Sequence, residues 1–205
     1  MINFEREPSI KDGTDEEIFQ NYMEDLRFAP DDFDKKILDV GAGSAKFAKW
    51  AKEHGVSKEI YSLDPVKENL AEKEKSVVAI SEALPFKDES FDLIISNAAI
   101  PNMHIGNDLE TVRGKVFNSL NEMVRVVKSG GEIRLGRVLI GKKYSPQRNL
   151  SSSIQEVLDT LNKKSGCQIN KIRMPYADTY ENDRRTGSRE LLAEAYLIII
   201  LKKKK

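Results

Sequence analysis

Residues 36–50 read Lys-Ile-Leu-Asp-Val-Gly-Ala-Gly-Ser-Ala-Lys-Phe-Ala-Lys-Trp, which joins a short apolar run to a glycine turn and then to a helical pattern. The apolar run is typical of a buried strand. Gly41 and Gly43 permit backbone angles and a close ligand approach that a Cβ would block. A strand-to-helix turn of this kind presents free backbone N–H groups at the positive end of a helix, so it favours a ligand with anionic or acceptor oxygens. A tight turn in some other α/β domain is the alternative.

The next apolar run ends in an acid, Asp64, about twenty residues after the glycines. A strand, a turn, a crossover helix and a second strand bring such an acid alongside the glycine turn, at the carboxyl edge of a parallel sheet. There its carboxylate can accept hydrogen bonds from both ribose hydroxyls. Asp64 before Pro65 can instead simply cap the following helix. The order of the elements favours ribose binding.

Two further segments identify a family. Residues 83–97 read Ala-Leu-Pro-Phe-Lys-Asp-Glu-Ser-Phe-Asp-Leu-Ile-Ile-Ser-Asn, and residues 122–133 read Glu-Met-Val-Arg-Val-Val-Lys-Ser-Gly-Gly-Glu-Ile. With residues 36–50 they resemble, in order, the motifs of class I S-adenosylmethionine-dependent methyltransferases. The resemblance covers residues 36–140 and is closest to the small-molecule methyltransferases whose middle motif contains Leu-Pro-Phe. It implies S-adenosylmethionine as cofactor and S-adenosylhomocysteine as product.

The resemblance also implies roles for particular residues. Asp39 would help to order the first loop and interact near the cofactor's amino group, while Gly41 and Gly43 would let its amino-acid portion approach the backbone. Ser96 and Asn97 would border the methionine portion and the methyl-transfer site. The complete set of expected cofactor-binding residues is Asp39, Gly41, Ala42, Gly43, Asp64, Pro65, Ile80, Ser81, Glu82, Ser96 and Asn97.

The chain departs from the family pattern at two positions. Ala45 stands where many relatives have a third glycine, and we expect it to be tolerated if the backbone there is helical. Ile80 stands where many relatives carry an Asp that accepts from the adenine amino group, a bond that Ile80 cannot make. The backbone N–H of Ser81 can still reach the ring edge, with Ile80 on its face and Glu82 as a substitute acceptor. We therefore expect binding, though weaker than in those relatives.

The sequence predicts one domain, residues 1–205, with residues 1–33 as an amino-terminal helical cap and residues 34–205 as a Rossmann-like core. We expect a three-layer α/β sandwich, and the resemblance implies seven mostly parallel strands with an antiparallel last strand. Strands are expected near 36–40, 59–63, 77–80, 91–96, 132–140, 168–174 and 193–201. Helices are expected near 14–28, 44–54, 66–74, 108–128 and 150–164. The apolar run 197–201 is too short for a membrane anchor and fits a core strand, while Lys202–Lys205 fits a solvated tail.

Composition limits the class of protein. The chain has 205 residues, with 33 basic and 33 acidic side chains and a formal net charge of zero, which disfavours nucleic acid as a partner. A single Cys167 excludes an internal disulfide framework, and with two His residues it leaves no recognisable zinc or other metal cluster. The sequence shows no apolar run long enough to span a bilayer and no signal-peptide arrangement, so we expect a cytoplasmic protein without membrane contact.

Three loops are expected to build the acceptor pocket: residues 100–108, 141–148 and 176–189. His104 in the first loop is the candidate catalytic base, with an exposed or substrate-orienting His as the alternative. The third loop holds Arg184, Arg185 and Arg189, which suit carboxylates or phosphates in a fork geometry, although neighbouring acids also fit a solvated loop.

These features predict a methyltransferase acting on a small molecule whose identity the sequence leaves open. Methyl transfer itself depends chiefly on positioning, because the sulfonium already activates the methyl group. An RNA or protein methyltransferase, a noncatalytic S-adenosylmethionine-binding regulatory subunit and a nucleotide-dependent oxidoreductase are the alternatives. In a homo-oligomer, a second copy of the chain would cover the apolar face of the amino-terminal helix, which is the alternative to packing within one chain.

Overall fold

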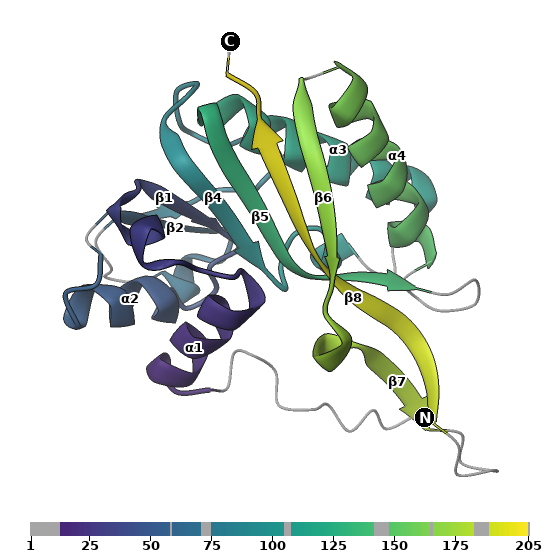
Figure 1. Cartoon of the computed structure of the whole chain (residues 1–205), viewed down its shortest axis with the longest axis horizontal. Helices are drawn as coiled ribbons and strands as arrows, with labels where there is room; N and C mark the ends of the chain where they lie inside the picture. Colours follow the sequence, from purple (N-terminus) through teal and green to yellow (C-terminus); the bar gives the residue numbers. More distant parts are fainter. Residues whose placement is uncertain are drawn as a thin grey trace.

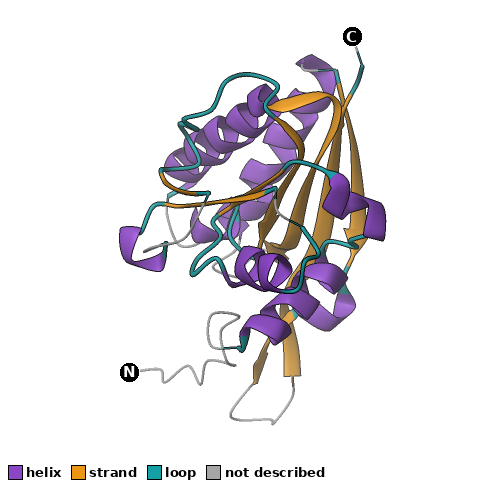
Figure 2. Cartoon of the chain, turned by 90° about the vertical axis from the view of Figure 1, so that its left-hand side faces the viewer, coloured by secondary structure: helices purple, strands orange, loops and turns teal. Residues whose placement is uncertain are grey.

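The computed structural model describes residues 13–57, 59–70, 75–104, 108–141, 148–164, 166–182 and 189–204. The chain is a three-layer α/β sandwich, with helices on both faces of a twisted sheet (Figure 1 and Figure 2). The strands are β1 (Ile37–Val40), β2 (Ile60–Asp64), β3 (Ser76–Val78), β4 (Phe91–Asn97), β5 (Val127–Gly141), β6 (Cys167–Arg173), β7 (Thr179–Asn182) and β8 (Arg189–Lys202). The α-helices are α1 (Asp15–Asp25), α2 (Lys46–Glu53), α3 (Leu109–Val126) and α4 (Arg148–Lys164). Short 3-10 helices are η2 (Pro30–Asp34), η3 (Lys67–Asn69), η4 (Asn102–His104) and η5 (Pro175–Ala177).

The sheet has the strand order β3-β2-β1-β4-β5-β8-β6. β1 pairs in parallel with β2 and β4, and β4 pairs in parallel with β5. The last strand, β8, lies antiparallel between β5 and β6, which confirms that prediction. The sequence analysis missed β7, which pairs only with β8. Its four residues, Thr-Tyr-Glu-Asn, lack the apolar alternation by which a half-buried strand is recognised.

The face covered by α1 and α2 is rich in aromatic side chains. α1 begins with a capping box between Thr14 and Glu17, as its residue types favour. The ring of Phe19 stacks on Trp50 with centroids 4.0 Å apart, and Tyr22 stacks on Phe47 at 4.5 Å. These contacts, together with a hydrogen bond from Lys46 to the Gly13 carbonyl, fix α1 against α2.

The opposite face is covered by α3 and α4, which pack on an aliphatic cluster that includes Leu120, Met123 and Leu161. β8 contributes buried Ile198 and Ile200 to this cluster and buried Leu197 to the cluster under α1 and α2, so the apolar run 197–201 is a core strand, as predicted. The prediction of a solvated tail is wrong for its first lysine. The ammonium of Lys202 donates to the carbonyls of Val124 and Val127 at 2.9 and 2.8 Å, at the end of α3 where unpaired carbonyls attract a cation.

The helix expected near residues 66–74 is also different. The structure has only the 3-10 turn η3 there, and residues 71–74 lie outside the described residues. Among the helices that the structure describes, none combines the length and the apolar character needed to cross a membrane.

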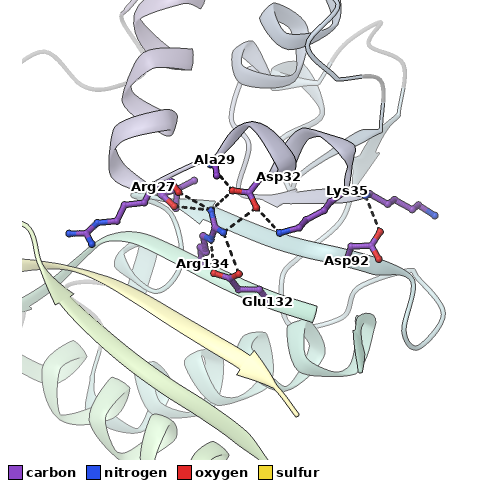
Figure 3. A network of polar contacts seen from close by, with 9 residues as sticks. Arg27, Ala29, Asp32, Lys35, Asp92, Glu132 and Arg134 are labelled. Carbon is purple, nitrogen blue, oxygen red and sulfur yellow. Dashed lines mark hydrogen bonds and ion pairs between the residues drawn. The ribbon is translucent and has the colours of Figure 1, made fainter. Parts of the chain in front are cut away.

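A buried ion pair fastens the amino-terminal segment to the sheet (Figure 3). Arg134 on β5 donates to both carboxylate oxygens of Asp32 in η2, at 2.8 and 3.2 Å, and to Glu132 at 2.6 Å. The same guanidinium donates to the carbonyls of Leu26 and Arg27, both at 3.2 Å, just after α1 ends. One side chain of the core therefore fixes the exit of α1 and the turn that follows.

Burial on its own would raise the pKa of Asp32, but hydrogen bonds from Arg134, Lys35 and the amide of Ala29 hold that pKa below its ordinary value. Because the folded-state pKa is lowered, the stabilisation is present above the ordinary carboxyl pKa and is lost as the pH falls through the folded-state value.

Replacing Asp32 by Asn should therefore lower the free energy of unfolding at neutral pH by about 3 kcal/mol, since it removes the more deeply buried of the two carboxylates that pair with the Arg134 guanidinium. Urea unfolding followed by circular dichroism measures this. The neighbouring Asp31 is exposed, so Asp31→Asn should change stability by less than about 0.5 kcal/mol. Equal effects of the two substitutions would contradict the assigned role of the Arg134–Asp32 pair.

Candidate functional site

A pocket of about 420 Å³ opens at the carboxyl ends of β1, β2 and β4. Its wall consists of the turn after β1, the segment after β2, residues 97–99 after β4, and Met103. Ile18 and Tyr22 of α1 close one side. This is the edge at which crossover loops of an open α/β sheet converge, and it is where the sequence places a ligand.

The turn after β1 has the backbone conformation that its glycines predict. Gly41 has φ +78° and Gly43 has φ +52°. A Cβ on Gly41 would lie 2.4 Å from the Cβ of Ala99, so a side chain there would displace the wall after β4. Ala45, just before α2, has φ +53°. We expected Ala45 to be tolerated if the backbone there had the ordinary right-handed helical conformation. The structure does not meet this condition, so Ala45 carries left-handed strain that glycine avoids.

The expectation of free N–H groups in this turn is wrong for three residues. The amides of Gly41 and Ala42 donate to the Leu63 carbonyl at 2.8 and 3.0 Å. The amide of Gly43 donates to a carboxylate oxygen of Asp64 at 2.9 Å. The turn is thus fastened to the end of β2, and its glycines allow close approach rather than supplying those donors to an anion.

Asp64 fills the capping role that the sequence left open as an alternative, and its role in ribose binding stays a prediction. One carboxylate oxygen caps the following turn, accepting from the amide of Val66 and the side chain of Asn69, both at 2.9 Å. The other holds Gly43, and the residue forms part of the pocket wall. A carboxylate has about four acceptor sites. Three are filled, so ribose hydroxyls would use the fourth and compete with the amide of Asn69.

Asp39 is the most unusual group near the pocket. Its side chain is completely buried, and both carboxyl oxygens lack a hydrogen-bond partner among the described residues. The hydroxyl of Tyr22 is close enough to lower the pKa somewhat, but no hydrogen bond of normal geometry joins the two side chains. Burial dominates and raises the pKa of Asp39 to about 8. Such a carboxyl suits a ligand that brings a positive charge, as an ammonium or sulfonium group does.

The two residues predicted at the end of β4 have different positions. Asn97 forms part of the pocket wall and donates to Asp25 on α1 at 2.8 Å. Ser96 is fully buried and lies behind the wall, where its hydroxyl accepts from the amide of Ile100 at 3.0 Å. Ser96 therefore shapes the turn that carries residues 97–99 into the wall.

The three residues expected around adenine do not belong to the wall of this pocket. The hydroxyl of Ser81 is hydrogen-bonded to Ser119 at 2.8 Å and to Glu82 at 2.9 Å. Ile80 is 52% exposed, which leaves its side chain accessible to a flat ring. A role for Ile80, Ser81 and Glu82 in adenine recognition stays a prediction.

His104 is 3% exposed and lies next to Met103, which is in the wall, whereas the imidazole itself is not. Burial lowers the pKa of His104 and outweighs the raising effect of nearby Glu82. The imidazole is thus neutral at neutral pH, the form that a general base requires, but its position is behind the wall. Its catalytic role stays a prediction. Asp108, the last residue of the first expected loop, caps α3 by accepting from the amide of Thr111 at 2.9 Å.

The other two expected acceptor loops are described only in part. Residues 142–147 and 183–188, with Arg184 and Arg185, lie outside the described residues, as does the side chain of Arg189. The described part of the third loop forms η5 and β7, and its Tyr176 donates to Asp25 at 3.2 Å.

Sequence reasoning missed Asp25 and Arg137. Asp25 is 1% exposed and accepts hydrogen bonds from Asn97, Arg137 and Tyr176. A signal existed, because Asp25 follows Ile18 and Tyr22 at helical spacing and so places a charge on the buried face of α1. Nothing comparable in the sequence marked Arg137, which depends on an irregularity in β5.

No group of three or more His, Cys, Asp or Glu side chains that could hold a metal ion occurs within the described part of the chain.

Parts of the chain are similar to known proteins. Residues 38–135 match a family model described as a methyltransferase domain. The chain is 33% identical over 108 residues to sarcosine/dimethylglycine N-methyltransferase of Aphanothece halophytica, an alignment that covers 47% of the chain and 35% of the relative. It is 30% identical over 141 residues to an uncharacterized protein of Methanocaldococcus jannaschii, covering 60% of each. The chain thus spans about a third and three fifths of the length of these curated relatives.

The fold is also that of solved methyltransferases. A crystal structure of a SAM-dependent methyltransferase from Methanosarcina mazei aligns with a TM-score of 0.54 at 18% identity, covering 92% of this chain and 98% of that one.

The close packing at Gly41 predicts that alanine substitutions at Gly41 and Gly114 have very different effects on stability. Gly41→Ala should lower the free energy of unfolding by about 3 kcal/mol, because it combines left-handed strain with a clash against Ala99. Gly114 lies in α3, and a Cβ added to it would have no atom within 4 Å, so Gly114→Ala should be neutral or stabilise by up to about 1 kcal/mol. Thermal and urea unfolding measure both, and a harmless Gly41→Ala would refute the close packing of this turn.

Because the pKa of Asp39 is raised, we expect Asp39→Asn to increase the free energy of unfolding by an amount that depends on pH. The folded chain keeps this proton up to about pH 8, whereas an unfolded Asp releases it near pH 4, so stability falls as the pH rises between these values. Asp39→Asn removes that loss. Its advantage over the wild type in urea unfolding should grow by up to about 1.4 kcal/mol per pH unit between about pH 5 and pH 8. A pH-independent difference would show that Asp39 is ionised in the folded chain.

Proposed function

We propose that the chain is a class I S-adenosylmethionine-dependent methyltransferase and that it transfers the methyl group of this cofactor to a small-molecule acceptor, which the match of residues 38–135 to a methyltransferase domain supports. The observation that carries the proposal is the completely buried, unpartnered carboxyl of Asp39 beside a pocket whose wall contains Asp64 and the glycine turn. These groups suit a ligand that combines a positive charge with hydroxyl groups. When bound, the cofactor supplies a methyl group activated by a sulfonium.

The chain's own residues would bind and orient. Asp64 would accept from a ribose hydroxyl while it keeps the turn after β1 in place through Gly43. Asp39 would provide the negative charge for the ammonium group once the side chain of Tyr22 on α1, which lies close to Asp39, yields to the ligand. Ile18 and Tyr22 would exclude water from one side of the site, as methyl transfer requires.

The acceptor is proposed to be small because the room is limited. A pocket of about 420 Å³ lies within the range for small-molecule sites and must also admit the cofactor. The curated relative from Aphanothece halophytica is named for methylation of an amine nitrogen, and we extend that acceptor class, a small amine, to this chain. We also propose a cytoplasmic location, which the presence of a single cysteine in the sequence supports, because one cysteine cannot form an internal disulfide framework.

Two alternatives remain from the sequence. A nucleic-acid methyltransferase would need a basic surface, and the zero net charge favours the small acceptor. A noncatalytic S-adenosylmethionine-binding subunit would share the cofactor site and differ only in turnover. Transfer of a radiolabelled methyl group to any acceptor distinguishes this alternative from the enzyme.

Calorimetry tests the cofactor site. The wild-type protein should bind S-adenosylmethionine and S-adenosylhomocysteine but not NAD, and Asp64→Ala should weaken both adenosyl ligands by about tenfold or more, which corresponds to about 1.4 kcal/mol. Glu68 lies four residues further on, exposed in η3, so Glu68→Ala removes the same charge without touching the pocket. Unchanged affinity in Asp64→Ala, or equal losses in both variants, would overturn the assignment of Asp64.

A further inference from the structure

Arg137 has a backbone conformation that arginine seldom adopts. Its φ is +51°, in the left-handed region, where a residue with a side chain is strained. The register between β5 and β8 shifts between Leu135 and Val138, so Arg137 lies in a bulge. Bulges near ligand sites commonly redirect a side chain, and strained residues concentrate at such sites. Arg137 is therefore a candidate functional residue.

The bulge is held by the loop that also forms the pocket. Asn102 donates from its amide nitrogen to the carbonyl of Arg137 at 2.6 Å and accepts from the amide of Leu139 at 3.1 Å. One side chain thus replaces the ladder hydrogen bonds that the bulge removes. The next residue, Met103, is in the pocket wall. On the other side, Asn97 pairs in register with Gly136, so the bulge begins at the level where β4 enters the wall.

A buried carboxylate sets the direction of the arginine side chain. The Nε of Arg137 donates to Asp25 at 2.6 Å, and Asn97 donates to the same oxygen at 2.8 Å. Tyr176 donates to the other oxygen at 3.2 Å. The Asp25 side chain is fully buried, whereas that of Arg137 is 27% exposed. The Nε of the guanidinium is thus fixed by Asp25, while part of the Arg137 side chain remains exposed.

The two terminal nitrogens of the Arg137 guanidinium have the geometry to bind a carboxylate. A guanidinium has five N–H donors, and the hydrogen bonds found among the described residues use only the one on Nε. The terminal N–H groups form a flat fork that matches the two oxygens of a carboxylate. Because Asp25 already fixes the side chain, little conformational freedom is lost when an anion binds. Tyr176, 57% exposed, lies beside this fork through its bond to Asp25.

We propose that Arg137, held by Asp25 and flanked by Tyr176, binds the carboxylate of the methyl acceptor at the edge of the cofactor pocket. This inference rests on the proposed function, since it names the acceptor class for that site: a small molecule with both a carboxylate and a nucleophilic atom. Asn97 connects the two subsites, because it belongs to the pocket wall and shares Asp25 with Arg137. Asp25 acts as a positioning residue.

The test uses paired probes that differ only in charge. Acetate, glycine and sarcosine are titrated into the full-length protein saturated with S-adenosylhomocysteine, alongside acetamide, glycinamide and sarcosinamide. The guanidinium NMR signals of Arg137, assigned by their loss in Arg137→Lys, should shift with the carboxylates and not with the amides. Arg137→Asn removes the charge with a residue that tolerates the left-handed region, so it should fold while losing at least tenfold in carboxylate affinity. In Arg137→Lys, which keeps the charge without the fork, the loss should be smaller.

Arg113 on α3 is the matched control, since its side chain is 65% exposed and pairs with Glu156 on α4. Arg113→Asn should leave carboxylate binding unchanged, and Tyr176→Phe should weaken it only slightly. Equal shifts with amides and carboxylates, no shift with any of the three carboxylates, or full affinity in Arg137→Asn would overturn the proposal. Failure of the wild-type protein to bind S-adenosylhomocysteine in calorimetry would instead overturn the proposed function, which separates the two failures.

Discussion

The parallel pairing of β1 with both β2 and β4 is the constraint on which the site depends. Val40 pairs with Leu63, and Asp39 pairs with both Ser62 and Ile95. This register ends the three strands at one edge of the sheet, so the glycine turn, Asp64 and residues 97–99 meet there. A slip of one residue would turn each strand's buried set to the opposite face.

Two buried carboxyl groups, Asp32 and Asp39, differ in their hydrogen bonding. The Arg134–Asp32 pair is buried and satisfied, and it fastens the amino-terminal segment to the sheet. Asp39 on β1 is buried close to Tyr22, and its carboxyl oxygens have no hydrogen-bond partner among the described residues. An unpartnered buried carboxyl costs stability unless a ligand compensates it. The helix that covers the pocket is thus held firmly at its exit, while the carboxyl under it stays available for a positive charge.

Most of the fold and several residues of the pocket wall were accessible from the sequence, because strand periodicity, glycine turns and an acid after the second strand are local patterns. The limits of β1, β2 and β4 agree with their predictions within a residue or two. The hydrogen bonds within the glycine turn were not predictable, since they depend on how β2 ends. The role of Arg137 was not predictable from the sequence either, because it depends on a bulge fixed by Asn102, which is 35 positions away. Asp25 could have been found from the spacing on α1, but its three partners come from distant segments.

The central claim is that the glycine turn, Asp64 and α1 enclose the cofactor. A crystal structure of the full chain with S-adenosylhomocysteine tests it most directly. The account predicts the ligand at the carboxyl ends of β1, β2 and β4, with a ribose hydroxyl on Asp64 and the ammonium group on the side of Asp39 and Tyr22. Ligand density at another face of the sheet, or an ammonium group turned away from Asp39, would contradict it.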